Sequence, residues 1–129
     1  MALIVVDASV VIALLDPADA LHAAARREFD QAAGDELALP ASALAETLVA
    51  PARAGKLELA WGRIQALELR IAGIDEDVAL EAARWRGLHD RLRLPDALVL
   101  ATAEILDAKV LLTGDAKWKL LSARVRVVA

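Results

Sequence analysis

The chain has 129 residues, of which 58% are hydrophobic, and it contains no cysteine. This composition predicts one domain over residues 1–129 with a sizeable core, and it excludes intrinsic disorder, disulfides, thiolate metal sites and a cysteine nucleophile. The net charge of −4 does not exclude a nucleic-acid partner, because acidic and basic side chains can gather at different places.

The first predicted element is a strand. Leu3 to Val6 is a short run of large and β-branched residues, which is typical of a strand covered on both faces in a parallel sheet. The run ends at Asp7, the only charged residue between Met1 and Leu15. A carboxylate in apolar surroundings needs a partner, because desolvation costs several kcal/mol. The partner of this carboxylate could be a helix N-terminus, a basic side chain or a metal ion.

The same N-terminal stretch does not resemble a signal peptide, because it lacks a basic flank and two aspartates interrupt its apolar run. No uninterrupted apolar run reaches the roughly 20 residues that a membrane-spanning helix needs. We therefore expect a soluble, cytoplasmic protein with no membrane partner.

Capping residues, glycines and prolines divide the rest of the chain. Ser9, Asp19 and Asp75 are placed to cap helices. Gly34 provides a stop signal, and Pro51 is expected to end or kink its helix. The predicted helices run from Ser9 to residue 15 and over residues 20–33, 42–50, 57–68, 76–91, 96–106 (with Pro95 as first residue) and 117–121. The predicted strands cover residues 3–6, 36–39, 69–74, 110–113 and 125–128.

Strands that alternate with helices throughout a chain are typical of a parallel sheet between two helical layers. The predicted fold is therefore α/β, with three α/β/α layers around a central, mostly parallel sheet of four to five strands. In such open sheets, ligands bind at the carboxyl ends of the strands.

Three further carboxylates are isolated in apolar segments. Glu46 is the only charge in residues 41–50, Asp96 is the only charge in residues 94–103, and Asp115 closely follows the strand at residues 110–113. Asp7 and Asp115 fall at carboxyl ends of predicted strands, and Asp96, at a helix start, could face the same edge. Four converging carboxylates repel one another, and a hard divalent cation such as Mg²⁺ or Mn²⁺ removes that conflict. Such a site can activate water for hydrolysis of a phosphodiester.

Each acid also has an ordinary structural explanation. Asp96 suits the first turn of a helix, Asp7 and Asp115 suit caps or turns, and Glu46 suits a solvated face. Each signal is weak by itself, and the order Asp, Glu, Asp, Asp on these elements is much more specific. The two histidines, His22 and His89, are too few for a zinc site.

Basic residues accompany the later acids, and they could hold phosphates beside the metal or simply form a solvated face. They are Arg84, Arg86, Arg91 and Arg93 before Asp96, and Lys117 and Lys119 after Asp115. The tryptophans Trp61, Trp85 and Trp118 are expected in the core or an interface more than against bases. His22 is expected to be structural, and His89 lies among the arginines.

The sequence resembles the PIN-domain ribonucleases, and within them the VapC-type toxins of toxin–antitoxin pairs. The resemblance covers essentially the whole chain and rests on four segments: Val6-Asp7-Ala-Ser9, Ala45-Glu46, residues 94–103 around Asp96, and Leu112-Thr113-Gly-Asp115. In many relatives an acid or asparagine lies just beyond the last segment. Here Ala116-Lys117-Trp118 follows, which puts a fifth acidic contact in doubt.

The resemblance implies a Mg²⁺- or Mn²⁺-dependent endoribonuclease. Asp7, Glu46, Asp96 and Asp115 would be the catalytic, metal-binding acids, and Ser9 and Thr113 would be supporting hydroxyls. It also implies an RNA substrate, a homodimer and a cognate VapB-like antitoxin that blocks the acidic groove.

Two alternatives remain open at this point. An aspartyl-phosphate phosphatase would use Asp7 as nucleophile, but such enzymes usually carry a second aspartate two residues on, where this chain has Ser9. A non-catalytic PIN-like module for RNA or protein binding would use the acids as caps and ion-pair partners.

Overall fold

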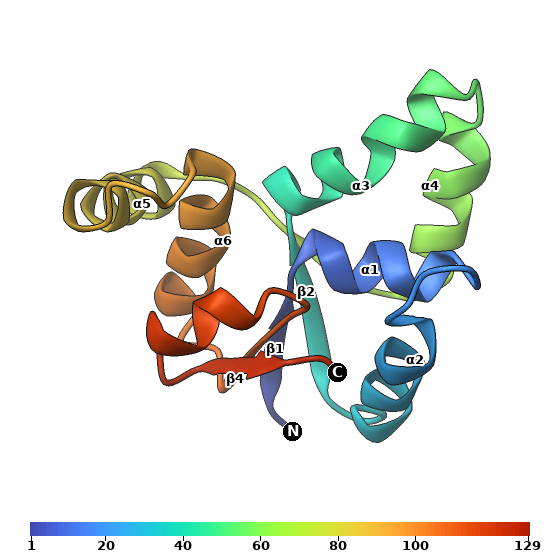
Figure 1. Ribbon diagram of the computed structural model, residues 1–129, viewed down its shortest axis with the longest axis horizontal. Helices are drawn as coiled ribbons and strands as arrows, with labels where there is room; N and C mark the ends of the chain where they lie inside the picture. Colours follow the sequence, from blue (N-terminus) through green and yellow to red (C-terminus); the bar gives the residue numbers. More distant parts are fainter.

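The computed structural model describes residues 1–129 and contains a five-stranded sheet with helices on both faces (Figure 1). The strand order is β3-β2-β1-β4-β5, and every neighbouring pair is parallel. This confirms the predicted α/β fold. The strands are β1 (Leu3–Val6), β2 (Glu36–Pro40), β3 (Arg70–Ala72), β4 (Val110–Thr113) and β5 (Val125–Val127).

Helices α5 and α6 lie on one side of the sheet, and α1 and α2 lie on the other, with α3 and α4 above them (Figure 1). None of these helices has both the length and the apolar character that crossing a bilayer requires. The helices are α1 (Ala8–Leu15), α2 (His22–Gln31), α3 (Ala41–Arg53), α4 (Leu57–Gln65), α5 (Glu76–Leu88) and α6 (Leu94–Ile105), followed by the 3₁₀ helix η1 (Ala116–Leu120).

Strand β1 lies in the middle of the sheet because its side chains are apolar on both faces. Val5 pairs with Ala38 of β2 on one side and with Leu111 of β4 on the other. Val5 and Val6 are completely buried. A central parallel strand needs this pattern, since helices cover both of its faces.

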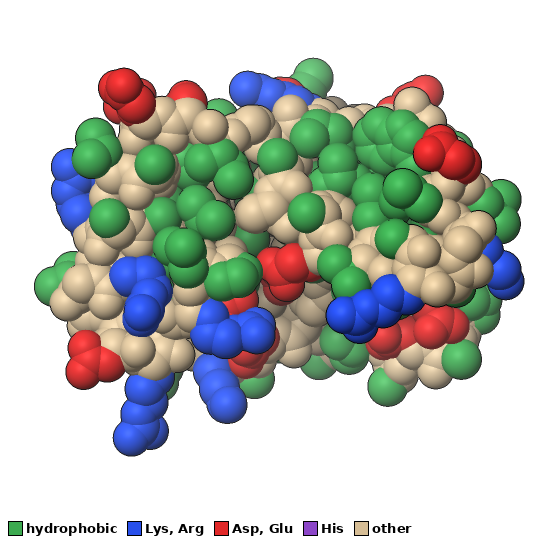
Figure 2. Space-filling view, turned by 90° about the horizontal axis from the view of Figure 1, so that it is seen from above, with side chains coloured by type: hydrophobic (Ala, Val, Ile, Leu, Met, Phe, Trp, Pro, Cys, Tyr) green, Lys and Arg blue, Asp and Glu red, His purple; other side chains and the backbone are tan.

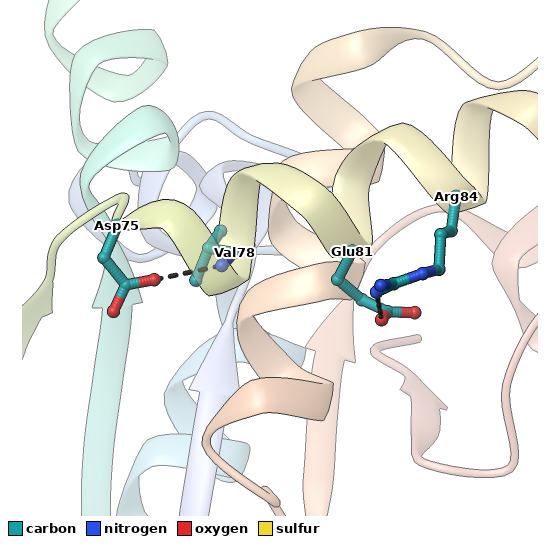
Figure 3. A network of polar contacts seen from close by, with 4 residues as sticks. All are labelled: Asp75, Val78, Glu81 and Arg84. Carbon is teal, nitrogen blue, oxygen red and sulfur yellow. Dashed lines mark hydrogen bonds and ion pairs between the residues drawn. The ribbon is translucent and has the colours of Figure 1, made fainter.

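Two predicted helix starts are wrong. Asp7, and not Ser9, is the N-cap residue of α1, and Ser9 is the second residue of that helix. Helix α2 begins at His22 because the side chain of Asp19 accepts a hydrogen bond from the backbone N–H of Leu21 (2.8 Å), which closes a turn instead of capping a helix. The capping role of Asp75 is confirmed, since its side chain accepts from the N–H of Val78 at 3.0 Å (Figure 3).

Several helix ends also differ from prediction. Helix α3 continues through Pro51 to Arg53, since a proline in the last turn costs a single N–H donor. Helix α4 stops at Gln65, and Glu68, predicted to be helical, has a left-handed φ of 57° that no α-helix contains. Helix α5 ends at Leu88, short of residue 91, and α6 begins at Leu94 with Pro95 in its first turn.

The core is a cluster of 28 buried side chains, most of them alanine, valine and leucine. Helix α6 is buried on most of its circumference, from Ala97 to Ala103, because it is packed between the sheet and α5. Trp85 and Trp118 belong to this core, as expected, and Trp61 packs against it while remaining half-buried.

We predict that Leu111→Ala lowers the free energy of unfolding by about 2–5 kcal/mol, because Leu111 is fully buried in β4 and its truncation leaves a cavity. Urea denaturation measures the change. Leu59→Ala is the matched control, since Leu59 is 64% exposed, and it is expected to change stability by less than about 0.5 kcal/mol. Equal losses for the two variants would contradict the assignment of the core.

Candidate metal-dependent active site

The ends of β1 and β4 lie side by side at the carboxyl edge of the sheet. Val6 pairs with Leu112, and the backbone N–H of Asp7 donates to the carbonyl oxygen of Leu112 at 2.9 Å. The parallel register therefore places Asp7 beside Thr113, although 106 residues separate them in the sequence. This is the edge at which open α/β sheets bind ligands.

Two hydroxyl groups hold the carboxylate of Asp7. Its Oδ2 accepts hydrogen bonds from Ser9 Oγ (2.9 Å) and Thr113 Oγ1 (3.0 Å), and the residue is only 8% exposed. Each hydroxyl also accepts a backbone N–H, from Gly114 to Ser9 at 2.9 Å and from Asp115 to Thr113 at 3.1 Å. The turn after β4 therefore determines where the Asp7 carboxylate points.

Gly114 permits this close approach. A Cβ atom at this position would lie 2.7 Å from Cδ1 of Leu21 and 3.3 Å from Oγ of Ser9. A larger residue would push against the hydroxyl group that receives the Gly114 N–H. The glycine in the Thr113-Gly-Asp115 segment is thus explained by packing around Ser9.

Charge links all four predicted acids, and three of them, Asp7, Glu46 and Asp96, have raised pKa values. Burial raises the pKa of Asp7, the hydrogen bonds from Ser9 and Thr113 lower it, and the charge of Asp96 raises it. Burial raises the pKa of Glu46, and the charges of Asp7 and Asp96 raise it further. Burial raises the pKa of Asp96, ion pairing with Arg93 lowers it, and the charge of Asp115 raises it. The acids therefore share one electrostatic environment that disfavours their negative charges.

The other acids are less firmly held than Asp7. Glu46 is half-buried on α3, and Asp96, in the first turn of α6, has its Oδ2 at 3.6 Å from Nε of Arg93. Asp115 is exposed, and its Oδ1 accepts the N–H of Lys117, which caps η1. In these side-chain positions no three Asp, Glu or His residues form a group able to hold a metal ion.

The chemistry of the donor set nevertheless suits a hard divalent cation. All four candidates are carboxylates, which Mg²⁺ and Mn²⁺ prefer, and these ions keep several water ligands instead of requiring a complete protein cage. A cation would also offset the burial and the smaller mutual repulsion that raise the pKa values of Asp7, Glu46 and Asp96. Viewed onto this edge, acidic side chains near the middle of the face are bordered by lysines and arginines (Figure 2).

The predicted basic residues separate into two groups. Arg91, Arg93 and Lys117 line an open hollow of about 640 Å³ together with Asp96 and Asp115. The complete lining is Leu88, His89, Asp90, Arg91, Leu92, Arg93, Asp96, Asp115, Lys117, Trp118 and Leu121.

The remaining basic residues do not line this hollow. Arg84 donates to Glu81 at 2.8 Å along α5 (Figure 3), and Arg86 donates to the carbonyl oxygen of Asp90 at 3.0 Å. Lys119 is exposed on η1 and does not line the hollow. These three residues lie outside the lining of the hollow, and their contact with RNA stays a prediction.

The two histidines have different surroundings. The Nδ1 of His22 lies 2.8 Å from the carbonyl oxygen of Ala13, so this ring joins α2 to α1 and is structural, as expected. The ring of His89 stacks on Trp85, with centroids 5.4 Å apart and planes at 28°. The sequence contained a signal for this stack, since the two residues are four apart at the end of α5.

A sequence model of the PIN domain family matches residues 4–123. No curated protein sequence matches the chain. Among solved structures, a chain in a toxin–antitoxin complex from Klebsiella pneumoniae is similar, with a TM-score of 0.79 at 22% identity over 97% of both chains.

Two further solved structures share the fold. VapC20 of Mycobacterium tuberculosis, described as a sarcin-ricin loop cleaving toxin, has a TM-score of 0.75 at 20% identity, covering 92% of this chain and 95% of its own. VapBC2 from Rickettsia felis, bound to a DNA fragment from its promoter, has a TM-score of 0.78 at 13% identity, covering 98% and 99%. Identities this low establish a common fold alone.

We predict that Asp7→Asn stabilises the metal-free protein at pH 7. Because burial raises the pKa of Asp7 in the folded state, the folded chain releases this proton at a higher pH than the unfolded chain. The ionised carboxylate therefore opposes folding at pH 7, and asparagine removes that cost. In EDTA, the melting temperature is expected to rise by about 3 to 5 °C for each kcal/mol relieved.

The pH dependence supplies the check on this prediction. The advantage of the variant should shrink as the pH falls through the raised pKa of Asp7, because the wild-type carboxyl then becomes neutral in the folded state. Asp77→Asn is the control, since Asp77 is exposed in the first turn of α5 and makes no side-chain hydrogen bond. An Asp7→Asn variant that is less stable than wild type at pH 7 would contradict the prediction.

Proposed function

The chain belongs to the PIN domain family, and on this basis we propose that it is a Mg²⁺- or Mn²⁺-dependent endoribonuclease, the toxin of a VapC-type toxin–antitoxin pair. The observation that carries the proposal is the buried Asp7 carboxylate, fixed by Ser9 and Thr113 at the carboxyl edge of the sheet and influenced by Asp96. The likeness of the fold to VapC20, described as a sarcin-ricin loop cleaving toxin, supports the substrate class.

In this proposal Asp7, Glu46, Asp96 and Asp115 hold the cation. When bound, the ion would stabilise the negative charge that develops on the phosphate and would lower the pKa of a water molecule. Ser9 and Thr113 orient Asp7 and favour its ionised form against the effect of burial, because hydrogen bonds to a carboxylate stabilise its charge.

Basic residues beside the acids position the RNA backbone. Arg91 and Lys117 are exposed at the hollow, and neither forms an ion pair with an acid. Arg93 pairs with Asp96 in the metal-free chain, so a cation at Asp96 would release its guanidinium group for a phosphate. Phosphate contacts of this kind fix the register of the RNA without reading its sequence.

The proposal extends to protein partners and location. We expect a cognate VapB-like antitoxin and a homodimer in the cytoplasm, since the similar structures include toxin–antitoxin complexes. Large apolar side chains suited to protein contacts are exposed on α3 and α4, among them Val49 at 45% and Leu59 at 64%. A hollow of about 220 Å³ lies beside them, lined by Leu44, Leu48, Leu57, Glu58 and Trp61.

One observation favours the second candidate, a non-catalytic binding module. Asp115 caps η1 and Asp96 pairs with Arg93, which are the ordinary structural roles of such acids. Titration with Mn²⁺ separates the candidates, because a module without a metal site would bind no ion. The phosphatase alternative has no comparable support, since Ser9 occupies the position of the second aspartate and donates to Asp7.

We predict that the purified chain, freed of any antitoxin, cleaves RNA with Mg²⁺ or Mn²⁺ and not in EDTA. Asp7→Asn is expected to lower the cleavage rate by about 100-fold or more, because it removes a charge from the cation site. A labelled RNA pool and gel analysis provide the measurement. Asp77→Asn removes the same charge from an exposed site on α5 and should cleave at the wild-type rate.

Cleavage that persists in EDTA, or an Asp7→Asn variant as active as the Asp77→Asn control, would reject the proposed chemistry. If the chain binds Mn²⁺ but cleaves no RNA, the ribonuclease proposal is rejected, and the metal site has another role.

We also predict that the open reading frame beside the gene encodes the neutralising partner. Co-expression should restore the growth of a bacterial host that the chain alone arrests, and the two proteins should elute together in size-exclusion chromatography. Asp7→Asn should not arrest growth but should still bind the partner, since Asp7 is buried. Growth arrest by Asp7→Asn equal to that by wild type would contradict toxicity through RNA cleavage.

A further inference from the structure

The open hollow of about 640 Å³ lies on one side of the proposed cation site and is larger than that site needs. Asp96 and Asp115 form part of its wall, whereas Asp7 and Glu46 do not. The rest of the wall comes from the loop between α5 and α6 and from η1. A strand of RNA with its scissile phosphate at the acids would therefore pass into or over this hollow.

The charges of the hollow suit a phosphate-bearing ligand once a cation is bound. Its wall carries Arg91, Arg93 and Lys117 against Asp90, Asp96 and Asp115, so the formal charges balance. A divalent ion on Asp96 and Asp115 would make the balance positive. The volume also falls in the range of about 300–1,000 Å³ that is typical of small-molecule sites.

The hollow also offers a rigid, flat ring. His89 lines it, and one face of the imidazole is covered by Trp85, which is only 9% exposed. The buried indole fixes the plane of the imidazole, so little side-chain entropy is lost when a second ring contacts it. Two apolar side chains of the lining, Leu92 and Trp118, are buried, with 8% and 3% exposed.

We propose that this hollow binds one nucleotide of the RNA next to the scissile phosphate, with its base against His89 and its phosphate near Arg91 and Lys117. This subsite would give the enzyme a base preference at one position of the cleavage site. The inference rests on the proposed function for its ligand class. It goes beyond that function because it assigns base recognition to a histidine held by a tryptophan.

The chain carries its own internal references for a test by NMR. It has two histidines and three tryptophans. His89, Trp85 and Trp118 belong to the hollow or support it, whereas His22 bonds to Ala13 and Trp61 lies on α4. The imidazole and indole resonances of the full chain should be followed during titration with each of the four nucleoside 5′-monophosphates, with Mg²⁺ present and with EDTA.

Saturable shifts of His89, Trp85 and Trp118 at millimolar nucleotide, with His22 and Trp61 unchanged, are the expected result. Adenosine without a phosphate should move the same resonances, and inorganic phosphate alone should leave the ring of His89 unmoved. Shifts that inorganic phosphate reproduces in full would overturn base binding and leave only an anion site. Equal shifts of all five rings, or none, would overturn the subsite.

Variants separate stacking from other roles of His89. His89→Ala should weaken nucleotide binding by about fivefold or more, because a base–ring stack is lost. His89→Phe keeps a flat ring four residues after Trp85 and should retain affinity within about twofold. Leu120→Ala is the control, since Leu120 is 95% exposed on η1 and does not line the hollow. Weakening by His89→Phe as severe as that by His89→Ala would reject stacking.

Cleavage specificity distinguishes this inference from the proposed function. His89→Ala should change which base is preferred beside the cut while metal-dependent cleavage continues. Metal-dependent cleavage with an unchanged base preference, and no nucleotide shifts, would reject the subsite and leave the ribonuclease standing. Nucleotide shifts in a chain that cleaves no RNA would reject the ribonuclease and support the subsite.

Discussion

The burial of Asp7 is the constraint on which the proposed site depends. A carboxylate that is 8% exposed at the end of a central strand is costly to ionise, and the protein offsets only part of that cost with two hydroxyl donors. The neighbouring charge of Asp96 adds to the cost instead of relieving it. Such an arrangement is unfavourable for stability alone, and it would become useful if the proposed cation completed it.

The same constraint explains the residues around Asp7. The hydroxyl groups of Ser9 and Thr113 each accept a hydrogen bond from a backbone N–H and donate one to the carboxylate. The orientation of both hydroxyls is therefore fixed by their partners. Gly114 fits the turn after β4 because a Cβ atom there would lie against Leu21 and, less closely, against Ser9. The segments around Asp7 and Asp115 are therefore one hydrogen-bonded unit that joins two adjacent strands.

The opposite side of the site is organised differently. Asp96, Arg93 and the loop before α6 are more exposed, and their contacts can exchange when a cation or phosphate arrives. A firmly held acid just after β1, next to more exposed groups on α6 and η1, would suit the proposed enzyme, which must hold a metal and admit a long RNA. The stack of His89 on Trp85 lies beside these more exposed charged residues.

The sequence by itself determined the strand at Leu3–Val6, the alternating elements and the four isolated acids, because runs and periodicity are local properties of the chain. The sequence placed the ends of helices less accurately. Asp19 closes a turn instead of capping a helix, and α3 continues through Pro51, because tertiary surroundings also influence where a helix begins and ends. Only the tertiary structure placed Thr113 on Asp7, paired Arg84 with Glu81 and Arg86 with the carbonyl oxygen of Asp90, and brought His89 into the hollow. These outcomes depend on strand order and side-chain direction, which contacts between distant parts of the chain decide.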